Sequence, residues 1–207
     1  MYTDSAGGRD VTLDAGTHVP DDWAGLLAAL IESTRHLMKL GLLAPLENGS
    51  LPSLRPPATP AQIAEAEGRL GERLDVHVRE LLQHTNGCDR LDGEFSLLSC
   101  EELGGPDWTK RVELRDAYWE SWPRDSWPTS LHVDPHRLIP IMVAYGTRSE
   151  IHSTPATDPL DLPRPVYDVG LDPVPDQTLK QALQTSLRLN IEQLAGHYDS
   201  SQEQERA

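Results

Sequence analysis

The chain has 207 residues, and its 33 acidic side chains against 18 Lys and Arg give a formal net charge of −15. This charge argues against direct binding to nucleic acid or to anionic membranes, because both surfaces attract clustered Lys and Arg. An acidic protein suits a basic partner instead, since opposite fields speed the encounter; acidity that serves only solubility is the alternative. A chain of this length fills one core well, so we expect a single domain.

The cysteine pattern and the N-terminal sequence indicate the compartment. Only Cys88 and Cys100 are present, which excludes a disulfide framework, and their spacing lacks the close pairs of a zinc site. Residues 1–16 have neither the basic nor the apolar region of a signal peptide, and no apolar run reaches the length of a membrane span. We therefore expect a cytoplasmic protein.

Residues 22–41 carry the signals of an amphipathic helix. Asp22 suits the N-cap and Gly41 the stop, and the apolar residues between them share one broad face: Trp23, Leu26, Leu27, Leu30, Leu37 and Leu40. Such a face has to be buried, so we expect the helix to pack on the core; an exposed helix that serves a partner is the alternative. Residues 1–20 lack a periodic apolar pattern and predict a mobile arm, and the Pro-rich residues 45–57 predict a linker.

Two helices with well-marked ends follow at residues 59–87. Thr59, Pro60 and Gln62 form an N-cap, a first-turn proline and a capping box, and Gly71 predicts a left-handed helix end. The apolar residues of this first helix lie at three- and four-residue steps: Ile63, Ala66 and Leu70. Asp75 begins the second helix, which has an apolar stripe and ends at Asn86-Gly87; the stripe consists of Val78, Leu81 and Leu82.

The remaining elements alternate between short strands and helices. We expect strands at 95–98, 138–145, 150–153 and 166–169, with Pro140 placing the second of them at a sheet edge or a bulge. Ser99 and Glu102 form another capping box. Asp107 suits the N-cap of a helix that reaches about Trp122, although its apolar residues only partly fit one face. A closing helix is predicted at 177–196, with Gly196 as its stop.

The helix pair also resembles a known family. The string T-P-x-x-I-x-x-A-E-x-x-L-G-x-x-L, followed by V-R-E-L-L-x-H-T-N-G, is similar to the SUKH superfamily of yeast cell-wall regulators and bacterial immunity proteins. The matching residues are Ile63, Ala66, Glu67, Leu70, Gly71, Leu74, Leu81, Leu82, Asn86 and Gly87. The resemblance covers about residues 57–103. It implies a fold more than a function, because these residues build a core.

Pattern and resemblance together predict an α+β fold, with one small, mostly antiparallel sheet packed against helices and an extra N-terminal helix. We divide the chain into a mobile arm at 1–20, an N-terminal helix and linker at 21–57, a SUKH-like domain at 58–198 and a polar tail at 199–207.

Few residues offer catalytic chemistry. His132, Asp134, His136 and His152 are metal-ligand types, but Pro135 excludes a helical i,i+4 pair and no H-E-x-x-H motif is present. His84 and Cys88 would form a nucleophile and base only on a continuous helix, which Asn86-Gly87 interrupts. We therefore expect no enzyme, no metal and no cofactor, and keep a metal-dependent enzyme as the third hypothesis.

The candidate residues are those that could contact a partner protein. Carboxylates gather in and after the helix pair, where residues 59–103 carry ten acidic and four basic side chains. Tryptophans gather at 119–128, and aromatic clusters are typical of interface anchors as well as of cores. The candidates for partner binding are Asp89, Asp92, Glu94, Glu101, Glu102, Trp119 and Trp122.

Two protein-binding functions remain open from the sequence. The resemblance implies a bacterial immunity protein that binds a basic nuclease or deaminase toxin and blocks its substrate site with carboxylates. The alternative is a regulatory or scaffold protein whose partner is an ordinary cellular protein. Because a fold alone does not determine a function, both stay as hypotheses.

Overall fold

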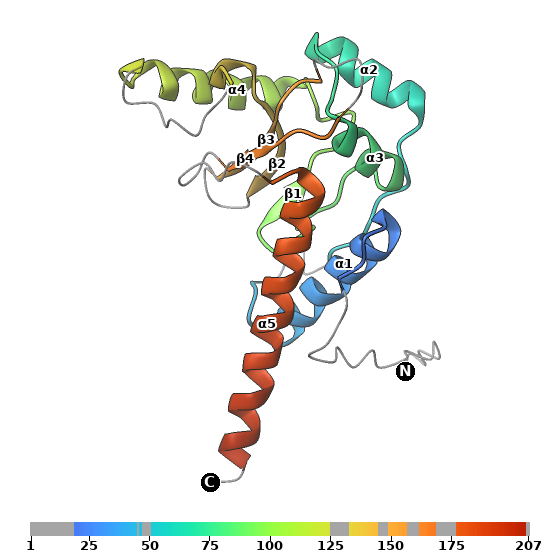
Figure 1. Cartoon of the computed structure of the whole chain (residues 1–207), viewed down its shortest axis with the longest axis vertical. Helices are drawn as coiled ribbons and strands as arrows, with labels where there is room; N and C mark the ends of the chain where they lie inside the picture. Colours follow the sequence, from blue (N-terminus) through green and yellow to red (C-terminus); the bar gives the residue numbers. More distant parts are fainter. Residues whose placement is uncertain are drawn as a thin grey trace.

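The computed structural model describes residues 19–44, 46, 51–124, 133–144, 149–156, 162–168 and 177–205. Five α-helices and a four-stranded antiparallel sheet lie within these ranges, so the predicted α+β class is confirmed. Residues 1–18, predicted as an arm, lie outside the described residues. Figure 1 shows the sheet between helix α4 on one side and helix α5 on the other.

Helix α1 (Trp23–Lys39) begins where the capping signal predicts. The backbone N–H of Gly25 donates to Oδ1 of Asp22 at 2.8 Å, which satisfies one of the free donors at the helix start. The apolar face is buried: Trp23, Leu26, Leu27, Leu30 and Ile31 belong to the same hydrophobic core as the sheet and the central helices. Helix α1 is thus part of that core.

Helices α2 (Pro60–Leu70) and α3 (Val76–His84) confirm the predicted pair. The capping box at Thr59 is complete, because the backbone N–H of Thr59 donates to Gln62 Oε1 at 2.9 Å and Thr59 Oγ1 accepts from the N–H of Gln62 at 3.3 Å. Gly71 has φ 69°, the left-handed conformation that glycine adopts without a Cβ penalty. Asp75 caps α3 through the backbone N–H of His77.

The residues before α2 run extended beside the end of α3. Their backbone pairs with it at two points: Ala58 N–H donates to Leu82 O at 2.8 Å, and Asn86 N–H donates to Pro56 O at 3.0 Å. The hydroxyl of Thr85 is buried and donates to Gly87 O at 2.8 Å. The described part of the predicted linker is therefore held against the fold by hydrogen bonds.

The sheet is an antiparallel meander in the order β1-β2-β3-β4. Its strands are β1 (Phe95–Leu97), β2 (Ile139–Ala144), β3 (Glu150–Ser153) and β4 (Val166–Asp168). Strand β2 pairs on both sides, so it is not an edge strand, and the register shifts between Pro140 and Met142. Pro140 was predicted to lie at a sheet edge or at a bulge, and the structure places it at a bulge, where a missing N–H is tolerated.

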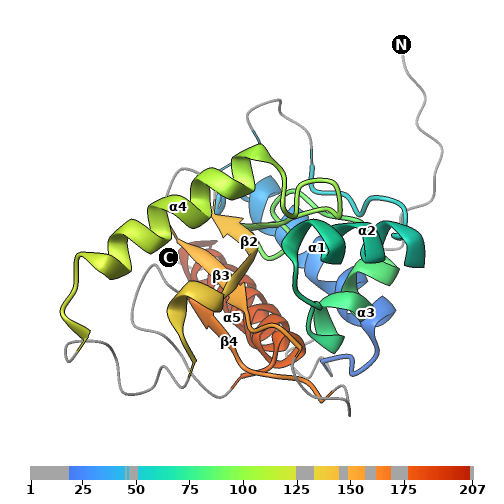
Figure 2. The same ribbon diagram turned by 90° about the horizontal axis from the view of Figure 1, so that it is seen from above.

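Helix α4 (Pro106–Glu120) begins earlier than predicted. Its N-cap is Gly105, which makes no side-chain cap bond, and Asp107 lies in the first turn instead of capping the helix. The reason is Pro106, which is favoured at the first helical position because its missing N–H needs no partner there. Seen from above in Figure 2, α4 crosses beside β2 and extends past the sheet. The short 3₁₀ helix η2 (Pro135–Arg137) packs against it.

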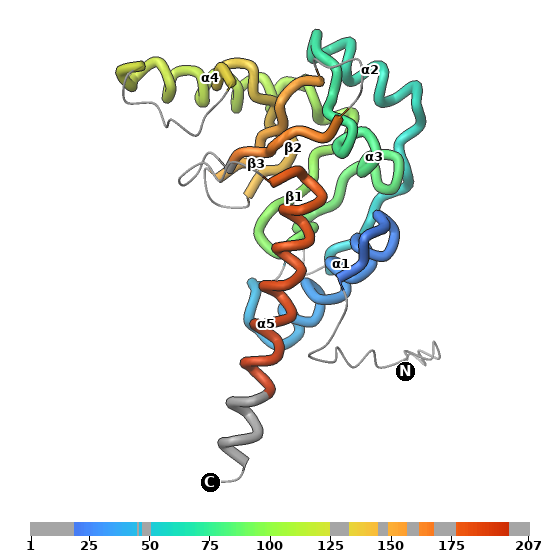
Figure 3. The backbone as a smooth tube through the Cα atoms, viewed as in Figure 1, coloured from blue at the N-terminus to red at the C-terminus, as the bar shows by residue number. Residues whose placement is uncertain are grey.

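Helix α5 (Leu179–Glu205) is longer than predicted, because Gly196 does not end it and the predicted polar tail is helical up to Glu205. A glycine in an exposed helix costs only about 1 kcal/mol relative to alanine, so it does not by itself stop a helix. Helices α1 and α5, from opposite ends of the chain, lie side by side (Figure 3). Asn190 Nδ2 donates to Ser33 Oγ at 3.0 Å inside this contact.

Substitution of Leu81 tests the core placement of the helix pair. Leu81 is fully buried in the core, so Leu81→Ala should lower the free energy of unfolding by about 2–5 kcal/mol, through lost burial and a residual cavity. The matched control is Leu189→Ala on α5, where the leucine is 59% exposed and the change should stay within about 0.5 kcal/mol. Equal urea midpoints for Leu81→Ala and wild type would show that α3 does not pack as described.

Candidate partner-binding site

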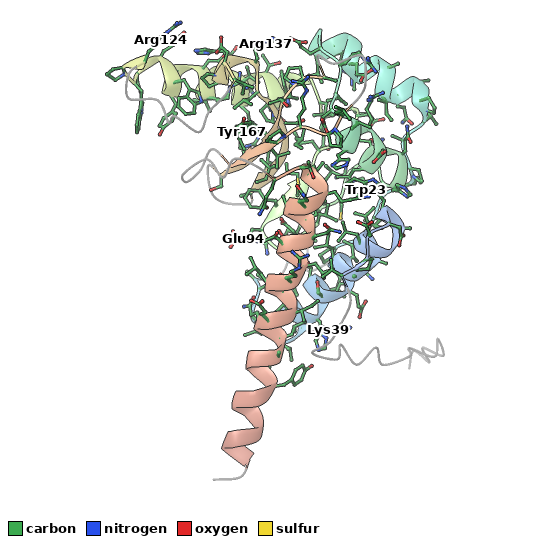
Figure 4. All side chains as sticks on the ribbon, in the orientation of Figure 1. Trp23, Lys39, Glu94, Arg124, Arg137 and Tyr167 are labelled. Atoms are coloured by element: carbon green, nitrogen blue, oxygen red, sulfur yellow. The ribbon has the colours of Figure 1, made fainter. Side chains whose placement is uncertain are left out.

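Of the five acidic residues predicted to bind a partner, four are exposed and one is half-buried. Asp89, Glu94, Glu101 and Glu102 are exposed, whereas Asp92 is half-buried. Glu94 lies on the short connection into β1 and points outward beside α5 (Figure 4). Asp89 and Glu94 lie in the loop between α3 and β1, Glu101 and Glu102 lie in the turn after β1, and we call these four exposed carboxylates the acidic face.

Arg55 joins two members of the acidic face. Its Nη2 lies 3.1 Å from Asp89 Oδ1, and its Nη1 lies 3.3 Å from Glu102 Oε2. All three side chains are well exposed, so each pair contributes at most about 1 kcal/mol. The carboxylates of Asp89 and Glu102 and the guanidinium of Arg55 together carry one net negative charge, and the two ion pairs fix the positions of both carboxylates.

Glu101 and Glu102 are also positioned by hydrogen bonds. Glu101 accepts from Gln62 Nε2 at 2.8 Å and from Asn86 Nδ2 at 2.9 Å. The bond from its own backbone N–H, followed by those from Gln62 and Asn86, holds the pKa of the Glu101 carboxyl below its usual range. Glu102 closes the predicted capping box, accepting from the N–H of Ser99 at 2.7 Å. Both carboxylates therefore present fixed negative charges instead of freely rotating ones.

Asp92 lies against α5 and does not belong to the acidic face. Its Oδ1 accepts from the backbone N–H of Phe95 at 2.9 Å, and its Oδ2 accepts from Ser186 Oγ at 3.4 Å. Burial raises the pKa of the Asp92 carboxyl to about 6, because the low-dielectric surroundings disfavour the charged form more than these hydrogen bonds favour it. Asp92 therefore connects the loop before β1 to helix α5 through these hydrogen bonds.

The two candidate tryptophans differ in exposure. Trp119 is 5% exposed, while Trp122 lies just after the end of α4 and is 43% exposed. The ring of Tyr118 lies 5.5 Å from the ring of each. Only Trp122 is available to a partner, and Trp119 contributes to the packing of α4.

Sequence reasoning missed the residues that accompany Trp122. Leu114 is 73% exposed and Tyr118 is 46% exposed, and with Trp122 they follow at four-residue steps along the outer side of α4. We call Leu114, Tyr118 and Trp122 the α4 stripe. The four-residue spacing can be read from the sequence. It does not stand out there, because the helix carries further apolar residues on its inner side and the apolar pattern as a whole fits no single face.

The inner side of α4 is bound to the sheet by polar contacts. Arg111 Nη1 lies 3.0 Å from Glu150 Oε1, and His152 Nε2 lies 3.0 Å from Glu150 Oε2. Burial acts to raise the pKa of the Glu150 carboxyl, but the bonds and charges of His152 and then Arg111 outweigh it and lower the pKa. Trp108 Nε1 donates to Pro140 O at 3.0 Å.

The cysteine thiols and histidine side chains that the sequence offers for catalysis or metal binding have defined structural surroundings. Burial raises the pKa of the Cys88 thiol to about 12 and that of the Cys100 thiol to about 11, so neither supplies a thiolate near neutral pH. His136 lies on η2, where its Nδ1 is 3.2 Å from Asp116 Oδ1, and His152 is buried on β3. His132 lies outside the described residues. Within the described ranges, no group of three or more His, Cys, Asp or Glu side chains is arranged to hold a metal ion.

Comparisons add no relative to these observations. The chain matches none of the protein-family models against which it was scanned, and a search of curated proteins found no match. Among the helices that the structure describes, none combines the length and the apolar character needed to cross a membrane.

The burial of Asp92 predicts a pH-dependent stability. Its pKa is about 6 in the folded protein and close to the ordinary 3.8 in the unfolded chain, so the folded state holds the extra proton between these pH values. The protonated Asp92 carboxyl makes its full contribution to the free energy of unfolding below about pH 4, and this contribution is lost as the pH rises through about 6. Asp92→Asn should therefore gain stability relative to wild type between pH 4.5 and 7.5, by up to about 3 kcal/mol.

Urea unfolding of both proteins across this pH range measures the difference. Glu94→Gln, at an exposed position in the same loop, controls for the loss of a charge. A difference between Asp92→Asn and wild type that does not change with pH, or an equal trend in Glu94→Gln, would contradict the burial of this carboxyl.

Proposed function

We propose that this chain is a non-enzymatic protein-binding module, and specifically a cytoplasmic bacterial immunity protein of the SUKH type. It binds a basic toxin, such as a nuclease or deaminase, and covers the toxin's substrate site with carboxylates. The observation that carries the proposal is the acidic face, where Glu101 and Glu102 are held in place by hydrogen bonds and Asp89 and Glu102 share Arg55.

Electrostatics explain why such a face suits a basic toxin. Enzymes that act on nucleic acid carry clustered Lys and Arg where the phosphates bind. Fixed carboxylates imitate those phosphates, and the formal charge of −15 attracts a basic protein over a longer range. Carboxylates that are already positioned lose little side-chain entropy on binding.

A regulatory or scaffold role is the second candidate, and the α4 stripe favours it. Exposed Leu114, Tyr118 and Trp122 form an apolar contact surface that does not depend on charge. A partner that binds there alone would show little salt dependence. The salt dependence of binding therefore separates the two functions.

The test starts from the gene neighbourhood: where a toxin-like gene lies adjacent to the gene for this chain, its product is the partner to be measured. Binding should weaken as salt rises from 50 to 300 mM, and Asp89→Lys/Glu94→Lys should weaken it at least about tenfold, equivalent to ~1.4 kcal/mol. Glu32→Lys/Glu65→Lys is the matched control, since it makes the same change in net charge at exposed positions on α1 and α2.

Two results would oppose the immunity function. Equal weakening by the two double variants would show that only net charge matters and that the acidic face is not the contact. Salt-insensitive binding that neither variant changes would favour the scaffold function instead. Growth of cells that express the toxin gives an independent readout, since an immunity protein should restore it.

A further inference from the structure

The first turn of α1 meets α3 and α5 at one side chain, that of Trp23. Its Nε1 donates to Oε2 of Glu80 on α3 at 2.7 Å, and Nζ of Lys180 on α5 lies 4.9 Å from the centre of its ring. The indole is 6% exposed, so it is buried by the elements that it joins. Figure 4 shows Trp23 where the start of α1 reaches α3.

His77 of α3 completes this contact. Its ring lies 5.7 Å from the ring of Trp23 at an interplanar angle of 84°, the T-shaped arrangement that aromatic rings favour. In the described part of the chain, Nδ1 of His77 is buried and has no hydrogen-bond partner. We call the four side chains of Trp23, His77, Glu80 and Lys180 the α1 joint.

The buried Nδ1 makes the α1 joint sensitive to the charge of His77. A neutral imidazole carries one N–H, so its other nitrogen is an acceptor, whereas a protonated imidazole carries an N–H on both nitrogens. Protonation of His77 therefore places a donor and a positive charge at a buried position that no described residue bonds. A buried donor without an acceptor costs its full desolvation free energy. The closed joint thus favours the neutral ring.

The ionisable groups around His77 do not reverse this preference. Burial has the largest effect and lowers the pKa of the His77 imidazole below its ordinary 6.5. The carboxylates of Asp75, which caps α3, and of Glu80 favour the charged ring, but together they are outweighed, and Lys180 of α5 adds to the lowering by repulsion. From α1 the ring is faced by Trp23, which does not titrate.

The direction of the pH effect follows from proton binding. Below about pH 6.5, an opened joint with a solvated His77 binds a proton that the closed joint excludes. The closed joint therefore keeps its full stability above about pH 6.5 and loses stability as the pH falls towards the lower pKa of the buried ring. Opening is confined to the start of α1, because Leu26, Leu27 and Leu30 hold the rest of the helix in the core.

We propose that the α1 joint is an acid-sensitive attachment of the start of α1. At neutral pH the joint holds Trp23 between α3 and α5. On acidification, protonation of His77 releases Trp23 and the first turn of α1 from α3, while the rest of α1 stays packed. The inference does not depend on the proposed function, since it involves neither the acidic face nor the α4 stripe. It gives α1, which precedes the region of family resemblance, an attachment that responds to pH.

Two local measurements on the full chain test the joint between pH 7.5 and 5.0. Fluorine NMR of protein labelled with 5-fluorotryptophan follows the five tryptophans, and Trp23→Phe identifies the resonance of Trp23. Hydrogen exchange, corrected for the pH dependence of the intrinsic rate, follows the first two turns of α1, with strand β2 as the internal reference. Local readouts are needed because Asp92 changes the stability of the whole protein in the opposite direction over the same pH range.

The variants separate the proton from the shape of the side chain. His77→Phe keeps an aromatic ring against Trp23 but cannot be protonated, and His77→Gln removes both the ring and the titration. The matched control is His84→Gln, at an exposed position at the end of the same helix. Circular dichroism at pH 7.5 checks that all variants remain folded.

In wild type, the Trp23 resonance should move towards its position in the urea-unfolded protein as the pH falls. The protection of the first two turns of α1 should fall at least about threefold between pH 7.5 and 5.0, while that of β2 stays within this factor. His84→Gln should behave like wild type. His77→Phe and His77→Gln should show neither the movement nor the loss of protection.

Three results would overturn the proposal: no pH dependence in wild type, the same pH dependence in both His77 variants, or an equal loss of protection in β2, which would mean that the whole protein opens. Asp75→Asn tests the other buried ionisable group of the joint, since Asp75 is 2% exposed and burial raises the pKa of its carboxyl. A pH dependence that disappears in Asp75→Asn but persists in His77→Phe would assign the proton to Asp75 and would also overturn the proposal.

Discussion

The burial of Arg115 divides α4 into a side that the fold uses and a side that it leaves to solvent. The guanidinium joins the carbonyl oxygens of Leu138 and His136 to the carboxylate of Asp116, so it fastens α4 to the segment that leads into β2. The pair of Arg111 and Glu150 adds a second attachment along the same side. A buried charge needs hydrogen-bond partners in fixed positions, and here these partners fix the rotation of a helix that carries large apolar residues on both its inner and its outer side.

The acidic face and the α4 stripe are two exposed surfaces of different chemistry. The acidic face offers positioned carboxylates, of which Glu101 is held ionised by its hydrogen bonds. The α4 stripe offers apolar contact. Charge speeds the encounter and selects the partner, while buried aromatic area slows its release.

The sequence allowed prediction of features that depend on neighbours along the chain. The capping box at Thr59 and the helix pair were correct, because their signals lie within a few residues. The end of α5 was not, because Gly196 weakens a helix without ending it. The role of Arg55 could not be found, since its partners are 34 and 47 residues away. The different exposures of Trp119 and Trp122 follow from how α4 is rotated, which long-range contacts decide.

Hydroxyl-radical footprinting of the free protein tests directly whether α4 keeps one side against the sheet and leaves the other side open to solvent. Tyr118 and Trp122 should be oxidised readily, and Trp119 should be protected until the protein is unfolded in urea. Protection of Tyr118 and Trp122 equal to that of Trp119 would contradict this orientation of α4, because the outer side of the helix would then be covered within the chain itself.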